Sequence, residues 1–146
     1  MIRRLAAVLA VLLAACANSP KFATVPPPPP SPFPESTYAE SPAIASLMKD
    51  ARTATELGQP ANAAALLERG LRIEPRNPRL WQQLSRVRLD QKDYAQAVSC
   101  AQRSSSWAGG DNALRFENWQ IIAKARGALG DAVGAKEALD AAERLK

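Results

Sequence analysis

The stretch LGQPANAAALLERGLRIEP, residues 57–75, decides how this chain is expected to fold, because its pattern occurs twice more in the sequence. The segments LDQKDYAQAVSCAQRSSSWAG at 89–109 and LGDAVGAKEALDAAERLK at 129–146 align with it. Each copy has a turn and then an alanine at a fixed place: Ala63, Ala97 and Ala135. The first two alanines are 34 residues apart and the next two are 38 apart, with the extra residues around SSWAGGDN. A repeat of this length predicts stacked helix–turn–helix units.

Helix start and stop signals follow the same period. Ser41-Pro42 and Asn77-Pro78 each place a capping side chain before a proline in the first helical turn. Aspartate or asparagine opens the later helices, at positions 93, 111 or 112, and 131, and glycine ends helices at 58 and 130. Six helices are therefore predicted, near residues 42–57, 60–73, 78–91, 94–105, 112–129 and 132–145, and the fold class is all-α.

The apolar and small residues of these units resemble the tetratricopeptide repeat. The second unit carries the aromatic and small residues of that family's pattern, at Trp81, Leu84, Tyr94 and Ala97. The first and third units match it at Leu47, Gly58, Ala63, Leu67 and Pro75, and at Trp119, Ile122, Gly130, Ala135 and Leu139. Small residues replace a consensus glycine at Ala51, Ser85 and Ala123, so close helix packing is retained.

The resemblance implies that residues 41–146 form three repeats in a short right-handed solenoid. In this family the first helix of each repeat lines a concave groove. Three repeats are about the minimum for a stable stack, and with no seventh, capping helix the apolar face of the last helix is expected to be exposed or covered by a partner.

The resemblance also suggests which residues would face the groove. One repeat position holds Met48, Gln82 and Gln120, and the position four residues later holds Arg52, Arg86 and Lys124. Because residues four apart share a helix face, the three cations are expected to form a basic column that takes carboxylates of a partner segment. The alternative is that these long side chains only solvate an exposed face. The carboxylate-clamp subclass has a Lys and Asn pair where this chain has Met48 and Arg52, so recognition of a free chaperone C-terminus is not expected.

Trp107 is the other candidate binding residue. It stands in SSSWAGGDN, which is expected to be a loop, and an exposed aromatic residue on a loop is typical of an interface anchor. The alternative is that Trp107 packs against the third repeat.

Composition excludes most catalytic chemistry. The chain has no histidine, which removes Ser-His and Cys-His nucleophiles and His-ligated zinc. It has no glycine-rich phosphate loop, and neither an enzyme activity, a cofactor, a metal nor a small-molecule substrate is expected. Its net charge of +5 is scattered rather than gathered in the dense basic run of a nucleic-acid site. Cys100 is interpreted as a small core residue, with a redox role as the alternative.

The N-terminal residues have the pattern of a secretory signal. Two arginines precede the apolar run LAAVLAVLL at 5–13, which is too short to span a bilayer of about 30 Å. The following LAAC resembles the bacterial lipobox, which implies cleavage after residue 15 and lipidation of Cys16. The alternative is an ordinary signal peptide in which Cys16 is incidental. Ala17 in place of aspartate favours the outer membrane in the sorting rules of that family.

Residues 16–40 read as a linker between this anchor and the repeats. They hold eight of the twelve prolines, which favour an extended polyproline II conformation, so a disordered tether is expected. It is interpreted as a spacer, with a ligand for a proline-binding module as the alternative.

The order of lipobox, proline-rich tether and small repeat domain resembles the outer-membrane lipoprotein activators of class A penicillin-binding proteins. That resemblance implies a periplasm-facing protein that binds and stimulates a bifunctional peptidoglycan synthase. The alternative is a tetratricopeptide scaffold or pilotin-like adaptor for a periplasmic assembly or protease complex.

Overall fold

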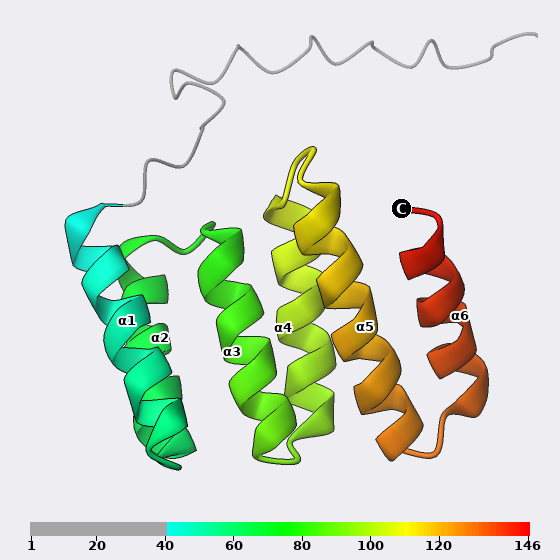
Figure 1. The fold of residues 1–146 in the computed structure, drawn as a ribbon, viewed down its shortest axis with the longest axis horizontal. Helices are drawn as coiled ribbons and strands as arrows, with labels where there is room; N and C mark the ends of the chain where they lie inside the picture. Colours follow the sequence, from blue (N-terminus) through cyan, green and yellow to red (C-terminus); the bar gives the residue numbers. More distant parts are fainter. Residues whose placement is uncertain (1–40) are drawn as a thin grey trace, which may run out of the picture. The chain divides into compact units, whose positions relative to one another are not determined.

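A computed structural model describes residues 41–146, and these form six helices and no strand (Figure 1). The signal peptide predicted at 1–15, the predicted lipidation site Cys16 and the tether predicted at 16–40 lie outside the described residues. The helices are α1 (Pro42–Glu56), α2 (Pro60–Ile73), α3 (Pro78–Asp90), α4 (Tyr94–Trp107), α5 (Asn112–Ala128) and α6 (Ala132–Glu143). The predicted fold class, three helix–turn–helix repeats, is confirmed. No helix of this part of the chain is both long and apolar enough to cross a membrane.

The predicted caps form at most helix starts. The Ser41 hydroxyl accepts a hydrogen bond from the backbone of Ile44, and the Asn77 side chain accepts from the backbone of Arg79 and Leu80. Aspartates at 93, 111 and 131 cap α4, α5 and α6 in the same way. Gly58 and Gly130 have φ values of 69° and 82°, a left-handed conformation that ends a helix without a side-chain clash. These caps explain why the observed helix boundaries follow the sequence signals closely.

The end of α4 is the main correction to the predicted boundaries. The sequence placed it at residue 105 and put Trp107 in a loop, whereas the helix continues to Trp107. The cause is a buried hydrogen-bond chain: the Ser104 hydroxyl donates to the Pro78 carbonyl oxygen at 2.8 Å and accepts from the Asn118 amide at 2.7 Å. Ser104 is thereby held in the core between α3 and α5, and its turn of helix is stabilised against unwinding.

Each helix packs against the next one in sequence, and the first helices of the repeats also touch one another. Helix α3 contacts both α1 and α5. Helices α2 and α4, the second helices of the first two repeats, do not bring their backbones within 8 Å of each other. The described domain therefore has one face on which α1, α3 and α5 lie close, and an opposite face on which α2 and α4 are separated.

Two clusters of buried side chains hold the domain together. The first core cluster joins α1–α4 and is rich in leucine, with Ile44, Leu67 and Leu80 fully buried. The second core cluster joins α4–α6 and consists of two isoleucines and five alanines. Half-buried Tyr94 and Trp119 pack against the second cluster and half-buried Trp81 against the first, so these aromatic residues of the repeat pattern help to hold the helices together.

Candidate protein-binding groove

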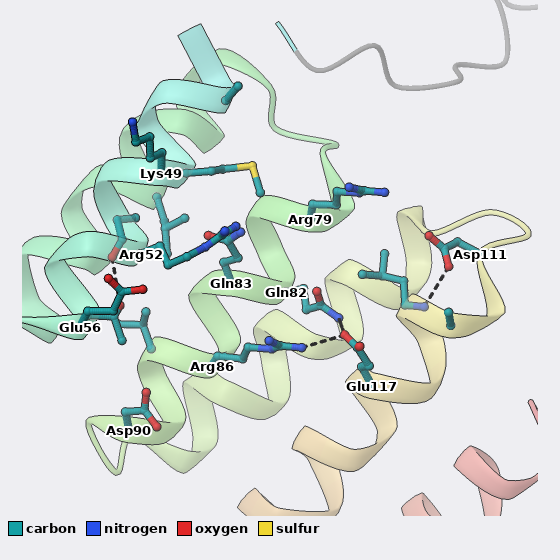
Figure 2. A pocket seen from close by; sticks show the side chains of 18 residues that line it. Lys49, Arg52, Glu56, Arg79, Gln82, Gln83, Arg86, Asp90, Asp111 and Glu117 are labelled. Carbon is teal, nitrogen blue, oxygen red and sulfur yellow. Dashed lines mark hydrogen bonds and ion pairs between the residues drawn. The ribbon is translucent and has the colours of Figure 1, made fainter. Parts of the chain in front are cut away.

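A groove of about 890 Å³ lies on the face where α1, α3 and the start of α5 meet (Figure 2). Its apolar floor contains Met48, Leu67, Val87 and Leu114, which are all buried. Charged side chains from all three helices surround this floor. An apolar floor with charged edges suits a peptide segment better than a compact, wholly polar ligand.

The structure brings four of the six predicted groove residues together. Met48, Arg52, Gln82 and Arg86 line the groove, the first two from α1 and the others from α3. Gln120 and Lys124 are exposed on α5 and do not line it. The first two repeats thus present the predicted positions to one groove, and the third repeat turns its equivalent positions away from it.

Glu117 of α5 lines the groove and contacts two groove residues of α3. One of its carboxylate oxygens accepts a hydrogen bond from the Gln82 amide at 2.8 Å and pairs with the Arg86 guanidinium at 2.7 Å. Arg86, the middle member of the predicted basic column, is therefore already neutralised by an acid of the same chain. Both side chains of the pair are about half exposed, so it contributes little to stability and chiefly sets the position of Arg86.

The remaining groove charges are arranged along its length. Lys49 and Arg79 lie early in α1 and α3, and Glu56 and Asp90 lie at the ends of the same helices. Figure 2 shows Lys49 and Arg79 toward one end of the groove and Glu56 and Asp90 toward the other, with a further acid, Asp111, at the start of α5. Together with Arg52, these side chains have no ion-pair partner within residues 41–146. The groove therefore carries charges of both signs rather than a uniformly basic lining, and along α1 and α3 the order runs from cations to acids.

Sequence reasoning missed Glu117, Lys49, Arg79, Glu56 and Asp90 as groove residues. Lys49 follows Met48 directly, and Arg79 precedes Gln82 by one helical turn, so the helical period could have identified these two once α1 and α3 were paired. Glu117 gives no local signal, because its contacts on α3 are 31 and 35 residues away in sequence.

Trp107 lies away from this groove, at the end of α4. Its side chain is 40% exposed, and the Arg76 guanidinium lies 5.0 Å from the centre of its ring. Arg76 belongs to the connection between α2 and α3, so Trp107 packs toward the junction of the first two repeats. The contact leaves part of the ring available to a partner.

Comparison with known proteins identifies the class. A family model described as tetratricopeptide repeat matches residues 54–115. The N-terminal domain of stress-induced protein-1 from C. elegans has the same fold, with a TM-score of 0.65 at 14% identity over 70% of this chain and 83% of that one. No curated protein matches the sequence. The chain is thus a tetratricopeptide-repeat protein, and its repeat domain is a protein-binding scaffold.

A second solved structure identifies the family within that class. The globular C-terminal domain of P. aeruginosa LpoP is 40% identical, with a TM-score of 0.68, and the match covers 71% of this chain and 97% of that one. The chain therefore belongs to the LpoP family. Because nearly all of that separately solved domain is matched, residues 41–146 are expected to fold on their own.

Proposed function

We infer that this chain is an outer-membrane-anchored lipoprotein that binds a bifunctional class A penicillin-binding protein and stimulates its peptidoglycan synthesis. Membership of the LpoP family carries the proposal, together with the resemblance of its lipobox and tether to lipoprotein activators of such synthases. The domain would act by binding alone, without catalysis of its own. Lipidated Cys16 would hold it on the membrane, and the tether would let the domain reach a partner.

The groove is the proposed docking site for the synthase. Met48 and Leu114 supply apolar surface, while Arg52 and Arg79 offer guanidinium groups without an acidic partner in the described domain. A partner helix or strand with acids at one end and bases at the other would match the charge order along α1 and α3. Gln120 and Lys124, outside the groove, are proposed as an extension of this surface along α5.

The proposal is tested by glycan polymerisation with the cognate class A synthase and residues 41–146. We expect the domain to raise the polymerisation rate, and the double variant Arg52→Glu, Arg79→Glu to bind at least about tenfold more weakly, which corresponds to about 1.4 kcal/mol. The matched control is Arg69→Glu, which reverses an exposed cation on α2 that lines neither this groove nor its floor. Lys124→Glu reports whether the surface extends over α5.

Two results would reject this assignment. One is a synthase that neither binds the domain nor responds to it. The other is full stimulation by the double variant, which would move the site away from the groove. Recovery of secretin or protease subunits instead of the synthase would favour the alternative, a scaffold or pilotin-like adaptor, which the repeat fold alone also supports.

Membrane anchoring is tested separately. A palmitate analogue supplied to growing cells should label the full chain, and Cys16→Ser should abolish both the label and sedimentation with outer membranes. Unchanged labelling of the variant would contradict lipidation at Cys16.

A further inference from the structure

A second hollow, of about 340 Å³, lies on the opposite face of the domain from the groove. It lies between α2 and α4, whose backbones stay apart, with α3 beneath them. Helix α3 faces the groove with Gln82 and Arg86 and faces this hollow with Trp81, Leu84 and Arg88. The groove and the hollow share no lining residue, so one can be altered without the other.

The floor of the hollow is apolar and buried. Leu71, Leu84 and Cys100 form it, with exposed fractions of 9%, 4% and 4%. Trp81 stands at its side, held in place because its indole N–H donates to the Pro75 carbonyl oxygen at 2.8 Å. Burial raises the pKa of the Cys100 thiol, so at neutral pH the floor carries no charge of its own.

The walls of the hollow carry more positive than negative charge. Arg72, Arg88 and Arg103 line it, and Glu68 is its one acid. Arg88 pairs with Glu68 at 2.6 Å, whereas the Arg103 guanidinium lies 4.8 Å from the centre of the Trp81 ring. Arg72 is exposed and has no ion pair in the described domain, which leaves two arginines available to an anionic ligand.

We propose that this hollow binds an acidic peptide segment of a protein partner, which inserts one aliphatic side chain over Leu71, Leu84 and Cys100 and places flanking carboxylates on Arg72 and Arg103. Guanidinium groups suit this task because their planar donors match a carboxylate. The proposal concerns a surface separate from the groove and does not depend on the identity of the synthase partner.

The shape and charge of the site favour a peptide over other anionic ligands. A free inorganic anion would not use the apolar floor, and a flat membrane surface would not enter a hollow between two helices. An aliphatic side chain fills an apolar pocket of this size, and neighbouring carboxylates then bring the charge that complements the two arginines.

The test is a selection of random peptides displayed on phage, with residues 41–146 as bait. We expect enrichment of sequences with an aliphatic residue among glutamates or aspartates. Synthetic copies should bind at least about tenfold more weakly to the variant Arg72→Glu, Arg103→Glu. Arg79→Glu in the groove and Arg69→Glu elsewhere on α2 are the matched controls and should bind as the unaltered domain does.

The position of the peptide is checked by NMR of the indole N–H groups. No tryptophan lines the groove, so a peptide in the hollow should shift the Trp81 signal, while one in the groove should not. Three results would overturn the proposal: no enriched acidic family, peptides whose binding is lost on Arg79→Glu instead, or a Trp81 signal that does not move. Binding to anionic phospholipid vesicles that depends on Arg72 and Arg103, without peptide binding, would also overturn it.

Discussion

The same repeat position is buried in the first repeat and exposed in the third. Leu67 in α2 and Leu139 in α6 stand four residues after the repeat alanines Ala63 and Ala135. Leu67 is fully buried, and Leu139 is 51% exposed. The difference comes from neighbours: α2 is packed against both α1 and α3, whereas α6 contacts only α5 in the described domain. Identical local sequence signals therefore give a core residue in one repeat and a surface residue in another.

The two core clusters differ in a similar way, because the first buries larger apolar side chains than the second. The first core cluster is filled largely by leucine, isoleucine and methionine from α1, α2 and α3, with Cys100 from α4. The second core cluster relies on alanines and two isoleucines, which bury less apolar area per residue. Val133 and Leu139 of α6 remain exposed in the described domain. We therefore expect α6 to be the least stable helix of the domain.

This contrast affects the proposed binding surfaces unequally. Met48, Leu67 and Val87 belong to the first core cluster and also line the groove, and no residue of the second core cluster lines it. The groove is therefore built on the better packed part of the domain. Changes that loosen α6 should leave binding in the groove largely intact.

The largest expected effect separates the two leucines. Leu67→Ala should lower the free energy of unfolding by about 2–5 kcal/mol, because it opens a cavity in the first core cluster. Leu139→Ala, at the equivalent exposed position, should change it by less than about 0.5 kcal/mol. Urea unfolding of residues 41–146, followed by circular dichroism, measures both. Similar losses for the two variants would show that α6 is packed as firmly as α2.

A pair of glycines tests packing in the opposite direction. A β-carbon on Gly70 would lie 2.9 Å from a methyl carbon of Leu80, which is itself fully buried. One on Gly127 would meet only the β-carbon of Ala135, at 3.9 Å. Gly70→Ala should therefore destabilise the domain by about 1–3 kcal/mol through overpacking. Gly127→Ala should stabilise it by about 0.5–1 kcal/mol through helix propensity. Thermal unfolding of both variants shows whether each substitution lowers or raises the stability. A stabilised Gly70→Ala would mean that the first core cluster can accommodate an extra methyl group beside Leu80.

The sequence could predict the fold well because its helix signals are local. Proline, aspartate and glycine act within one turn of where they stand, and the caps at Ser41, Asn77, Asp93 and Asp131 formed as predicted. The extension of α4 to Trp107 could not be predicted, because it depends on Ser104 meeting Pro78 and Asn118 from two other helices. Three serines in a row favour a loop until such contacts are known.

The candidate site was only partly predictable for the same reason. The repeat register alone predicted Met48, Arg52, Gln82 and Arg86, because α1 and α3 carry these positions 34 residues apart and contact each other. It failed to show that Glu117 neutralises Arg86, since that contact joins different repeats. The hollow between α2 and α4 was not predicted, because its existence depends on the spacing of two helices that are not consecutive.

A smaller effect is expected from the polar contacts that hold α6. The Arg126 guanidinium donates to the Gly134 carbonyl oxygen at 3.3 Å and lies 3.9 Å from Asp131 and 3.8 Å from Glu137. Arg126→Ala should lower the global free energy of unfolding by only about 0.5–1 kcal/mol, because these contacts are long and partly exposed. Hydrogen exchange should show faster exchange in α6 and no change in α2. Faster exchange in α2 as well would mean that the two core clusters unfold as one unit.

The smallest effect near neutral pH concerns Cys100, which belongs to the first core cluster. Its unfolded pKa is near 9.0, and burial raises the pKa in the folded domain, opposed by the nearby Arg88 and Arg103 charges. Since the folded state favours the neutral thiol, this contribution to stability is complete below pH 9 and is lost as pH rises through the folded pKa. Under reducing conditions, the stability difference between the unaltered domain and Cys100→Ala should be constant from pH 7 to 8. It should then change by at most about 1.4 kcal/mol per pH unit above pH 9. Comparison with the variant cancels the titration of lysines and tyrosine. If the stability difference between the unaltered domain and Cys100→Ala stays constant to pH 10, water reaches the thiol. The part of the first core cluster that forms the floor of the hollow would then be open to solvent.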